Sequence, residues 1–212
     1  MAALDDGYAD RAMPRRPLSP PSQPIGDGTV MLRVRRLEDM PAIAAASRDP
    51  ETLRRLQDAP LEPGRERESL ARVEEQWRNG RGAPFVVADA TNDEPLGLVN
   101  VQIADDGEVG GLAVSVFPGA RGRGVAPRAL RLAGVWALDE LGLQRVFAEA
   151  DVENVASVRA IEKAGFRREG VLRAHCATHG RRHDCVMFSL LPEDIAGDRA
   201  GRTPGTAGPT TA

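Results

Sequence analysis

Short alternating or apolar runs occupy the middle of the chain and predict the strands of a sheet. Val30, Leu32 and Val34 alternate with polar or smaller residues, while residues 85–88 form an unbroken apolar run. Asp106-Gly107 is a hairpin turn signal between two further runs. The predicted strands are residues 30–34, 85–88, 96–103, 108–117, 146–150, 166–173 and 184–191.

Other stretches place apolar residues at three- and four-residue steps, which predicts helices. Asp39 precedes a short helix that contains Ile43, and we expect its carboxylate to cap that helix. Val73 and Trp77 share one face of the next helix. Gly142 is suited to end a long helix over residues 124–141, and a shorter helix is predicted over residues 154–164.

The two terminal segments differ in composition from the chain between them. Residues 1–27 are rich in Pro, Arg and Ser, and residues 196–212 consist mainly of Gly, Thr, Pro and Ala. Such segments bury too little apolar surface to offset the entropy of ordering, so we predict two disordered tails. Residues 28–195 are predicted to form one domain, and no internal repeat is present.

Composition narrows the classes of function. The net charge is −3, with 42% hydrophobic and 28% charged residues, which is ordinary globular usage without the broad basic surface that nucleic acid requires. No apolar run has the length of a membrane helix, and the first residues lack the regions of a signal peptide. Two cysteines do not form a disulfide framework. We therefore expect a cytoplasmic protein that does not act at membranes or on nucleic acid.

The segment Arg121-Gly122-Arg123-Gly124-Val125-Ala126 lies between a predicted strand and a predicted helix. A glycine-containing loop that leads into a helix offers backbone N–H groups and the positive end of the helix dipole to an anion. The two arginines add donors that suit phosphate oxygens. The alternative is a surface turn that happens to contain glycine and arginine.

A second block resolves that choice by resemblance. The loop matches a pattern of Arg or Gln, two residues, Gly, one residue, and Gly or Ala, through Arg121, Gly124 and Ala126. About thirty residues later, further matches follow in order. They are Asn154, Ser157, Glu162, Lys163, Gly165, Phe166, Glu169 and Gly170. Together the two blocks resemble the GNAT superfamily of acyl-CoA-dependent N-acyltransferases, and most closely its branch that acetylates ribosomal-protein N-termini.

The resemblance implies an α+β, three-layer fold with a twisted mixed sheet of six or seven strands between helices. It implies that the strand before the loop and the next strand splay apart to form a cofactor cleft. The implied reaction transfers an acetyl group from acetyl-CoA to a primary amine in a ternary complex, and a homodimer is plausible. Two alternatives stay open: a non-catalytic acyl-CoA-binding or sensor module on the same fold, and a nucleotide or RNA binder.

The resemblance also assigns residues to the cofactor. The loop residues Arg121, Gly122, Arg123, Gly124, Val125 and Ala126 would hold the pyrophosphate of CoA, and the backbone groups of Val114, Ser115 and Val116 would pair with the pantetheine arm. A Val114 or Val116 amide could also donate to the developing oxyanion. Asn154 either contacts the pantetheine arm or only caps its helix. Ser157 either protonates the leaving thiolate or is a solvated serine.

The general base is less defined. Glu108 begins the strand that leads to the loop, and relatives often have a glutamate there that acts through water. Glu149 and Asp151 end the neighbouring strand and are rival candidates. The proton could instead leave through a chain of water molecules, or the amine could arrive neutral.

The acceptor amine is not identified by the sequence, nor is the acyl group shown to be strictly acetyl. Residues 39–81 and the hairpin around Gly180 would contact the acceptor, and acidic residues there such as Glu51, Asp58, Glu62 and Glu66 could attract a cation. The segment 175–185 contains every histidine and cysteine, but its spacing matches no common zinc pattern, so we expect no metal.

Overall fold

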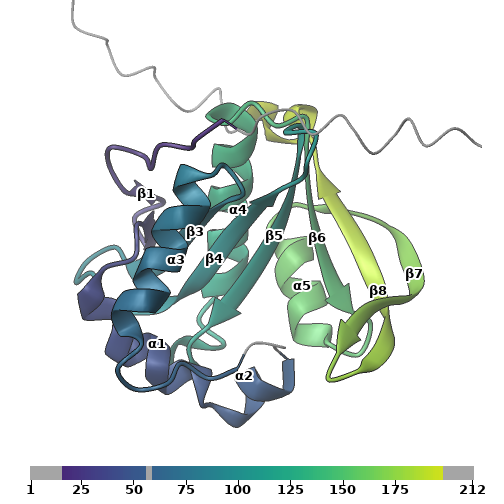
Figure 1. Cartoon of the computed structure of the whole chain (residues 1–212). Helices are drawn as coiled ribbons and strands as arrows, with labels where there is room; N and C mark the ends of the chain where they lie inside the picture. The colour runs from purple at the N-terminus through teal and green to yellow at the C-terminus, as the bar shows by residue number, and fades with distance from the viewer. Residues whose placement is uncertain (1–15, 56–58, 198–212) are drawn as a thin grey trace, which may run out of the picture.

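The computed structural model describes residues 16–55 and 59–197 (Figure 1). Eight strands form one sheet among these residues, in the order β1-β2-β3-β4-β5-β6-β8-β7. Every neighbouring pair is antiparallel except β5 and β6. The strands are β1 Ile25–Gly26, β2 Val30–Arg33, β3 Gly82–Asp89, β4 Pro95–Ile103, β5 Val109–Val116, β6 Arg145–Asp151, β7 Arg167–Thr178 and β8 Arg181–Leu190.

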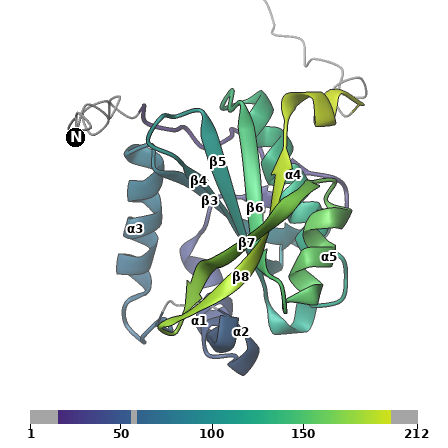
Figure 2. The same ribbon diagram turned by 90° about the vertical axis from the view of Figure 1, so that its right-hand side faces the viewer.

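Helices cover both faces of the sheet. They are α1 Met40–Ser47, α2 Pro50–Arg55, α3 Glu66–Arg78, α4 Val125–Asp139 and α5 Val155–Lys163, with short 3-10 turns at Leu37–Asp39, Pro118–Ala120 and Pro192–Ile195. Figure 2 shows α3 on one side of the sheet and α4 with α5 on the other. The arrangement is the predicted three-layer α+β fold, with helices packed on a twisted mixed sheet.

The core follows from the periodicity of the sequence. β3 is buried over Gly82 to Ala88, because it is a central strand with a helical layer on each side. The apolar stripe of α4 supplies a row of buried residues that includes Leu130, Ala133 and Trp136. The rings of Trp77, Phe85 and Trp136 pack edge to face, with centroid separations of 5.1–6.0 Å.

The predicted boundary of the N-terminal tail differs from the structure. Ile25 is buried and pairs with Leu32, and the amide of Leu18 donates to the carbonyl of Trp77 at 2.9 Å. Ordered structure therefore begins before residue 28, and β1 is the additional strand that brings the sheet to eight. A two-residue strand has no periodicity of its own, so the sequence pattern does not reveal it. The other parts of the predicted tails, residues 1–15 and 198–212, lie outside the described residues.

β5 and β6 separate along their length. Their parallel pairing joins Val109 to Arg145 and continues only as far as Leu112 with Ala148. The last part of β5 keeps its pairing with β4, while the last part of β6 pairs with β8. The edges of β5 and β6 that face each other are therefore unpaired beyond Leu112 and Ala148. This separation is the predicted splay (Figure 1).

A buried ion pair fixes the chain between β2 and α1. Arg33 donates from two guanidinium nitrogens to the Asp39 carboxylate, each at 2.8 Å, and both side chains are at most 5% exposed. Asp39 also accepts the backbone N–H of Arg36 at 2.7 Å. The prediction that the Asp39 carboxylate caps α1 is wrong, because it makes no cap hydrogen bond there. Its partner is a cation that only the tertiary fold brings close.

Candidate functional site

The loop before α4 has the geometry of an anion site. Gly122 and Gly124 both have φ of 76°, in the left-handed region that glycine adopts without a steric penalty. Gly124 is the N-cap residue of α4, so the first N–H groups of that helix point out of its end. Among the described residues, no acceptor is present for the amides of Gly122, Arg123 and Gly124. The loop therefore presents a row of free donors.

The space in front of these donors is open. A Cβ atom built on Gly122 or Gly124 would meet nothing within 4 Å. The Arg123 side chain is 56% exposed and lies 4.0 Å from the Asp89 carboxylate. Val125 is buried, so α4 is anchored against the core by its first residue. A pyrophosphate would fit this position, since it needs backbone donors, a nearby cation and no Cβ in the way.

The Arg121 side chain has a different partner from the one expected. Its guanidinium donates to the Asp49 carboxylate at 2.6 Å and to the Thr52 hydroxyl at 2.9 Å. These residues lie before and in α2, a short helix that the sequence pattern did not predict. The hydrogen bond from Arg121 holds the pKa of Asp49 below its usual value. The Arg121 side chain thus joins the loop to α2. That the backbone of Arg121 contacts CoA stays a prediction.

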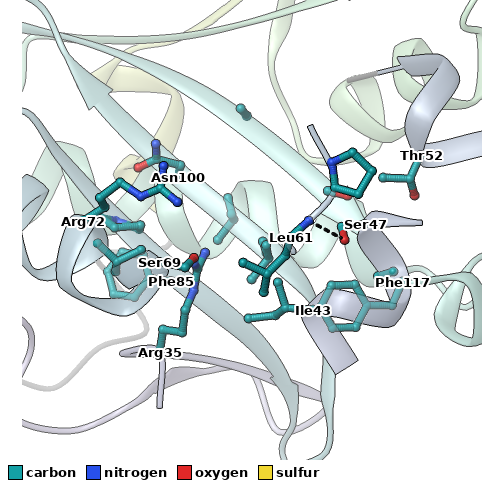
Figure 3. Close-up of a pocket in the computed structure, with 18 of the residues that line it drawn as sticks. Arg35, Ile43, Ser47, Thr52, Leu61, Ser69, Arg72, Phe85, Asn100 and Phe117 are labelled. Atoms are coloured by element: carbon teal, nitrogen blue, oxygen red, sulfur yellow. Dashed lines mark hydrogen bonds between the residues drawn. The ribbon is translucent and has the colours of Figure 1, made fainter. Parts of the chain in front are cut away.

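A cavity of about 650 Å³ lies between α1, α2, α3 and strands β3 to β5. Ala113, Val114 and Ser115 of β5 form part of its wall. Figure 3 shows Arg35, Ser69, Arg72 and Asn100 gathered in one part of the cavity. Ser47 and Thr52 lie in another part, where the Ser47 hydroxyl accepts the backbone N–H of Leu61 at 3.0 Å.

The cavity and the loop meet at the end of β5. Val114 and Ser115 line the cavity, and Val116 is followed by the turn that leads into the Gly122–Gly124 loop. The edge of β5 that faces β6 is unpaired in this stretch, because the pairing stops at Leu112. Two molecules could therefore approach the same strand end, one from the loop and one from the cavity.

The two predicted residues of α5 lie together. The Asn154 side-chain oxygen accepts the backbone N–H of Ser157 at 3.2 Å, which makes Asn154 the cap of α5. The prediction that Asn154 caps its helix is therefore confirmed. Both residues follow β6 at the end where it has left β5, and the lining of the cavity includes neither of them. Their contacts with a pantetheine arm stay predictions.

The three carboxylates considered as a base differ in position. Glu108 is exposed and precedes β5, six residues before Val114, which places it about 20 Å away along an extended strand. Glu149 and Asp151 lie on the part of β6 beyond its pairing with β5. Phe147 is the partner of Gly111, so alternation puts Glu149 on the same face of the sheet as Ala113 and Ser115. The structure does not bring Glu108 to the cavity.

The histidine- and cysteine-rich segment forms the β7–β8 hairpin. His175 lies 3.2 Å from the Glu149 carboxylate, His183 lies 3.8 Å from that of Asp151, and the ring of His179 contacts the carbonyl of Leu53 at 2.9 Å. Cys176 and Cys185 form a disulfide, a pairing that the cysteine count did not predict. Residues 16–55 and 59–197 contain no group of three or more His, Cys, Asp or Glu that could hold a metal ion.

Sequence reasoning missed the polar residues of the cavity. Arg35 follows β2, Arg72 lies on α3 and Asn100 lies on β4, so they are distant in sequence. The Arg35 Nε and the Asn100 Oδ1 are buried without a hydrogen-bond partner. Burial lowers the pKa of Arg35 from its usual value. The sequence gives only a weak signal for Arg35: it follows the apolar residues of β2 and is two residues after Arg33.

Comparison with known proteins gives the family. Residues 29–167 match the family model described as an acetyltransferase (GNAT) domain. The chain is 27% identical over 169 residues to the uncharacterized N-acetyltransferase p20 of Bacillus licheniformis, covering 78% of this chain and 94% of that protein. It is 36% identical over 78 residues to the putative ribosomal N-acetyltransferase YdaF of Bacillus subtilis, covering 37% of this chain and 43% of that protein.

Solved structures share the fold. RimJ of Mycobacterium smegmatis, in complex with CoA-disulfide, superposes with a TM-score of 0.70 at 20% identity, over 79% of this chain and 84% of that chain. Among the residues described for this protein, no helix is long and apolar enough to cross a membrane. The family match spans more than half of the chain, and its relatives are named N-acetyltransferases. The chain therefore belongs to the GNAT family and is an acetyltransferase.

Proposed function

We propose that the protein transfers an acetyl group from acetyl-CoA to a primary amine by direct attack within a ternary complex. The observation that supports this is the meeting of the Gly122–Gly124 loop and the cavity at Val114 and Ser115. The two reactants would approach one strand end from different sides. We propose that this takes place in the cytoplasm, and the homodimer that the resemblance implies stays a prediction.

The loop would hold the CoA pyrophosphate, and the free edge of β5 would pair with the pantetheine amides. An extended arm laid along an unpaired strand edge gains backbone hydrogen bonds as an added strand does. Val114, Ser115 and Val116 lie on that edge beyond the β5–β6 pairing. The thioester would then lie near the cavity, where a backbone N–H of Val114 or Val116 could donate to the carbonyl oxygen as negative charge develops.

Proton transfer completes the reaction. The attacking nitrogen must lose a proton as its bond to the carbonyl carbon forms, and the carbon–sulfur bond then breaks to release CoA as thiol or thiolate. Ser157 is the proposed donor to the sulfur, although a thiolate with a pKa near 8.5 also leaves unaided. By alternation, Glu149 and Asp151 both lie on the cavity face of the sheet, and Glu149, beside His175, is the nearer of the two to the last β5–β6 pair. We therefore favour Glu149, acting through water, as the proton acceptor.

Acetyl-CoA is expected to bind in the micromolar range in a calorimetric titration, whereas ATP is expected to bind at least about tenfold more weakly, because it lacks the arm that pairs with β5. Amine-dependent release of thiol would then establish turnover. Firm binding of acetyl-CoA without turnover on any amine of a broad panel would favour the sensor alternative. A failure to bind acetyl-CoA would contradict the proposal.

Glu149→Gln is expected to lower kcat about tenfold, less than a full general-base contribution because water shares the proton. Glu108→Gln is the matched comparison, since it makes the same change at an exposed carboxylate that does not line the cavity. It should leave kcat and its pH profile unchanged. Steady-state rates over a range of pH, with acetyl-CoA affinity measured separately, show which of the two carboxylates accepts the proton. A loss of turnover in Glu108→Gln alone would restore Glu108 as the base.

A further inference from the structure

Arginines outnumber carboxylates among the described residues that line the cavity. Its charged lining residues are Arg35, Arg65, Arg72 and Glu62. Arg65 is paired with Glu68 at 2.5 Å, so its charge is compensated on the surface of α3. Within residues 16–55 and 59–197, neither Arg35 nor Arg72 has an ion pair. Two arginines therefore line the cavity without a direct ion pair among the described residues.

Arg35 gives the stronger indication of a bound ligand. Its Nε is buried and has no hydrogen-bond partner. The opposite charge that acts on it is Asp39, whose carboxylate already accepts two hydrogen bonds from Arg33 and one from the Arg36 backbone. The residue as a whole is only partly buried, but a buried N–H without an acceptor costs stability. Such a residue is typical of an anion-binding site, in which affinity for the ligand is obtained at the expense of the folding stability of the free protein.

Polar residues beside Arg35 fit the same ligand. Figure 3 shows the side-chain ends of Arg35 and Arg72 directed into the same part of the cavity, next to Ser69 and Asn100. The carbonyl oxygen of Asn100 is buried and unpaired, and as an acceptor it suits an N–H donor of the ligand rather than its anionic group. A guanidinium binds carboxylate or phosphate oxygens through two parallel hydrogen bonds, and a second guanidinium and a hydroxyl would add to it.

We propose, on the basis of the proposed function, that the acceptor is a primary amine that also carries an anionic group, a carboxylate or a phosphate, bound by Arg35 and Arg72. Of the four acidic residues that could have attracted a cation, two are engaged elsewhere among the described residues. Glu51 pairs with Arg54 and Arg55, Glu66 accepts from the Gly64 amide, and Asp58 lies outside the described residues. Glu62 is the one carboxylate among the described lining residues.

The sheet sets the separation of the two ends of this acceptor. Arg35 follows β2, and β5 lies three strand positions away across β3 and β4, which is about 14 Å between backbones. The arginine side chain covers part of that distance. The amine at β5 and the anion at Arg35 are therefore separated by a chain of several bonds, which favours an extended amine over an α-amino acid.

Three amines of equal length test the proposal: 6-aminohexanoate, hexylamine and 1,6-diaminohexane, which carry an anion, a methyl group or a second cation at the far end. Each is titrated calorimetrically into protein saturated with CoA, so that binding is measured without turnover. We expect 6-aminohexanoate to bind at least about tenfold more tightly than hexylamine, because it alone makes charge-assisted hydrogen bonds with arginine. The diamine is expected to bind most weakly. A further titration with 6-aminohexyl phosphate shows whether phosphate or carboxylate is the preferred anion.

Arg35→Gln is expected to weaken binding of 6-aminohexanoate about tenfold or more, since the contact to a charged group is lost. Arg36→Gln is its matched control, because Arg36 is the next residue and its side chain pairs with Asp93 outside the cavity. Arg72→Gln, a change on an exposed part of α3, provides a second variant that does not depend on a buried position. It should weaken the same amine but not hexylamine.

The outcomes separate this inference from the proposed function. Equal binding of the three amines, tighter binding of the diamine, or no binding of either anionic amine would overturn the inference. Equal acetylation of all three from acetyl-CoA would leave the function standing without it. Binding of 6-aminohexanoate that depends on Arg35, with no acetylation of any amine, would support the anion site and contradict the transferase.

Discussion

Gly124→Glu is expected to weaken acetyl-CoA binding about a hundredfold or more, because at least two charge-assisted hydrogen bonds, each worth roughly 1.5–3 kcal/mol, would be lost. The Cβ at this position points into open space in front of the loop amides. A glutamate there would occupy the space of the pyrophosphate and place a like charge beside it. Calorimetric titration with acetyl-CoA measures the loss directly.

The matched control is Gly142→Glu at the other end of the same helix. Gly142 has φ of 72°, against 76° for Gly124, and a Cβ on it also meets nothing within 4 Å. Both variants should therefore lose a similar stability, about 1–2 kcal/mol, from placing a side chain in the left-handed region. Only Gly124→Glu should lose affinity. Unchanged affinity in Gly124→Glu would remove the loop from the cofactor site.

Asp39→Ala is expected to destabilise the fold by about 3 kcal/mol or more, because it leaves the buried Arg33 guanidinium without its main partner. The second partner, Asp93, is 39% exposed and bonds to Arg33 at 2.5 Å, so it compensates only in part. For a domain of this size, such a change lowers Tm by about 6–12 °C. Thermal unfolding in the absence of ligands is the measurement.

Glu38→Ala is the control for Asp39→Ala. Glu38 is the preceding residue, it is exposed, and it should change the free energy of unfolding by less than about 0.5 kcal/mol. The comparison also concerns function, because Arg35 lies on the segment that the Arg33–Asp39 pair holds in place. If the two variants had the same Tm, Asp93 alone would be sufficient to neutralise Arg33.

Local patterns were enough to predict most elements and the loop. The three- and four-residue spacing of Leu130, Ala133 and Ala137 locates α4, because burial of one helix face repeats at the helical period. The glycines of the loop could also be predicted from the sequence, because a backbone in the left-handed region is a local property that favours glycine. The distance between Glu108 and Val114 is likewise a local property, because residues of an extended strand rise about 3.3 Å each.

The sequence by itself determined the order of the elements other than β1 and α2, the glycine-containing turn before α4 and the cap of α5 at Asn154, which depend on neighbours in the chain. Only the tertiary structure decided which strands pair and where β5 leaves β6. It alone brought Arg35, Arg72 and Asn100 to one cavity and gave Asp39 to Arg33 instead of to α1. The physical reason is that charge compensation and burial depend on residues beyond the local helical turn or strand, most of them distant in sequence, whose positions the packing of helices on the sheet determines.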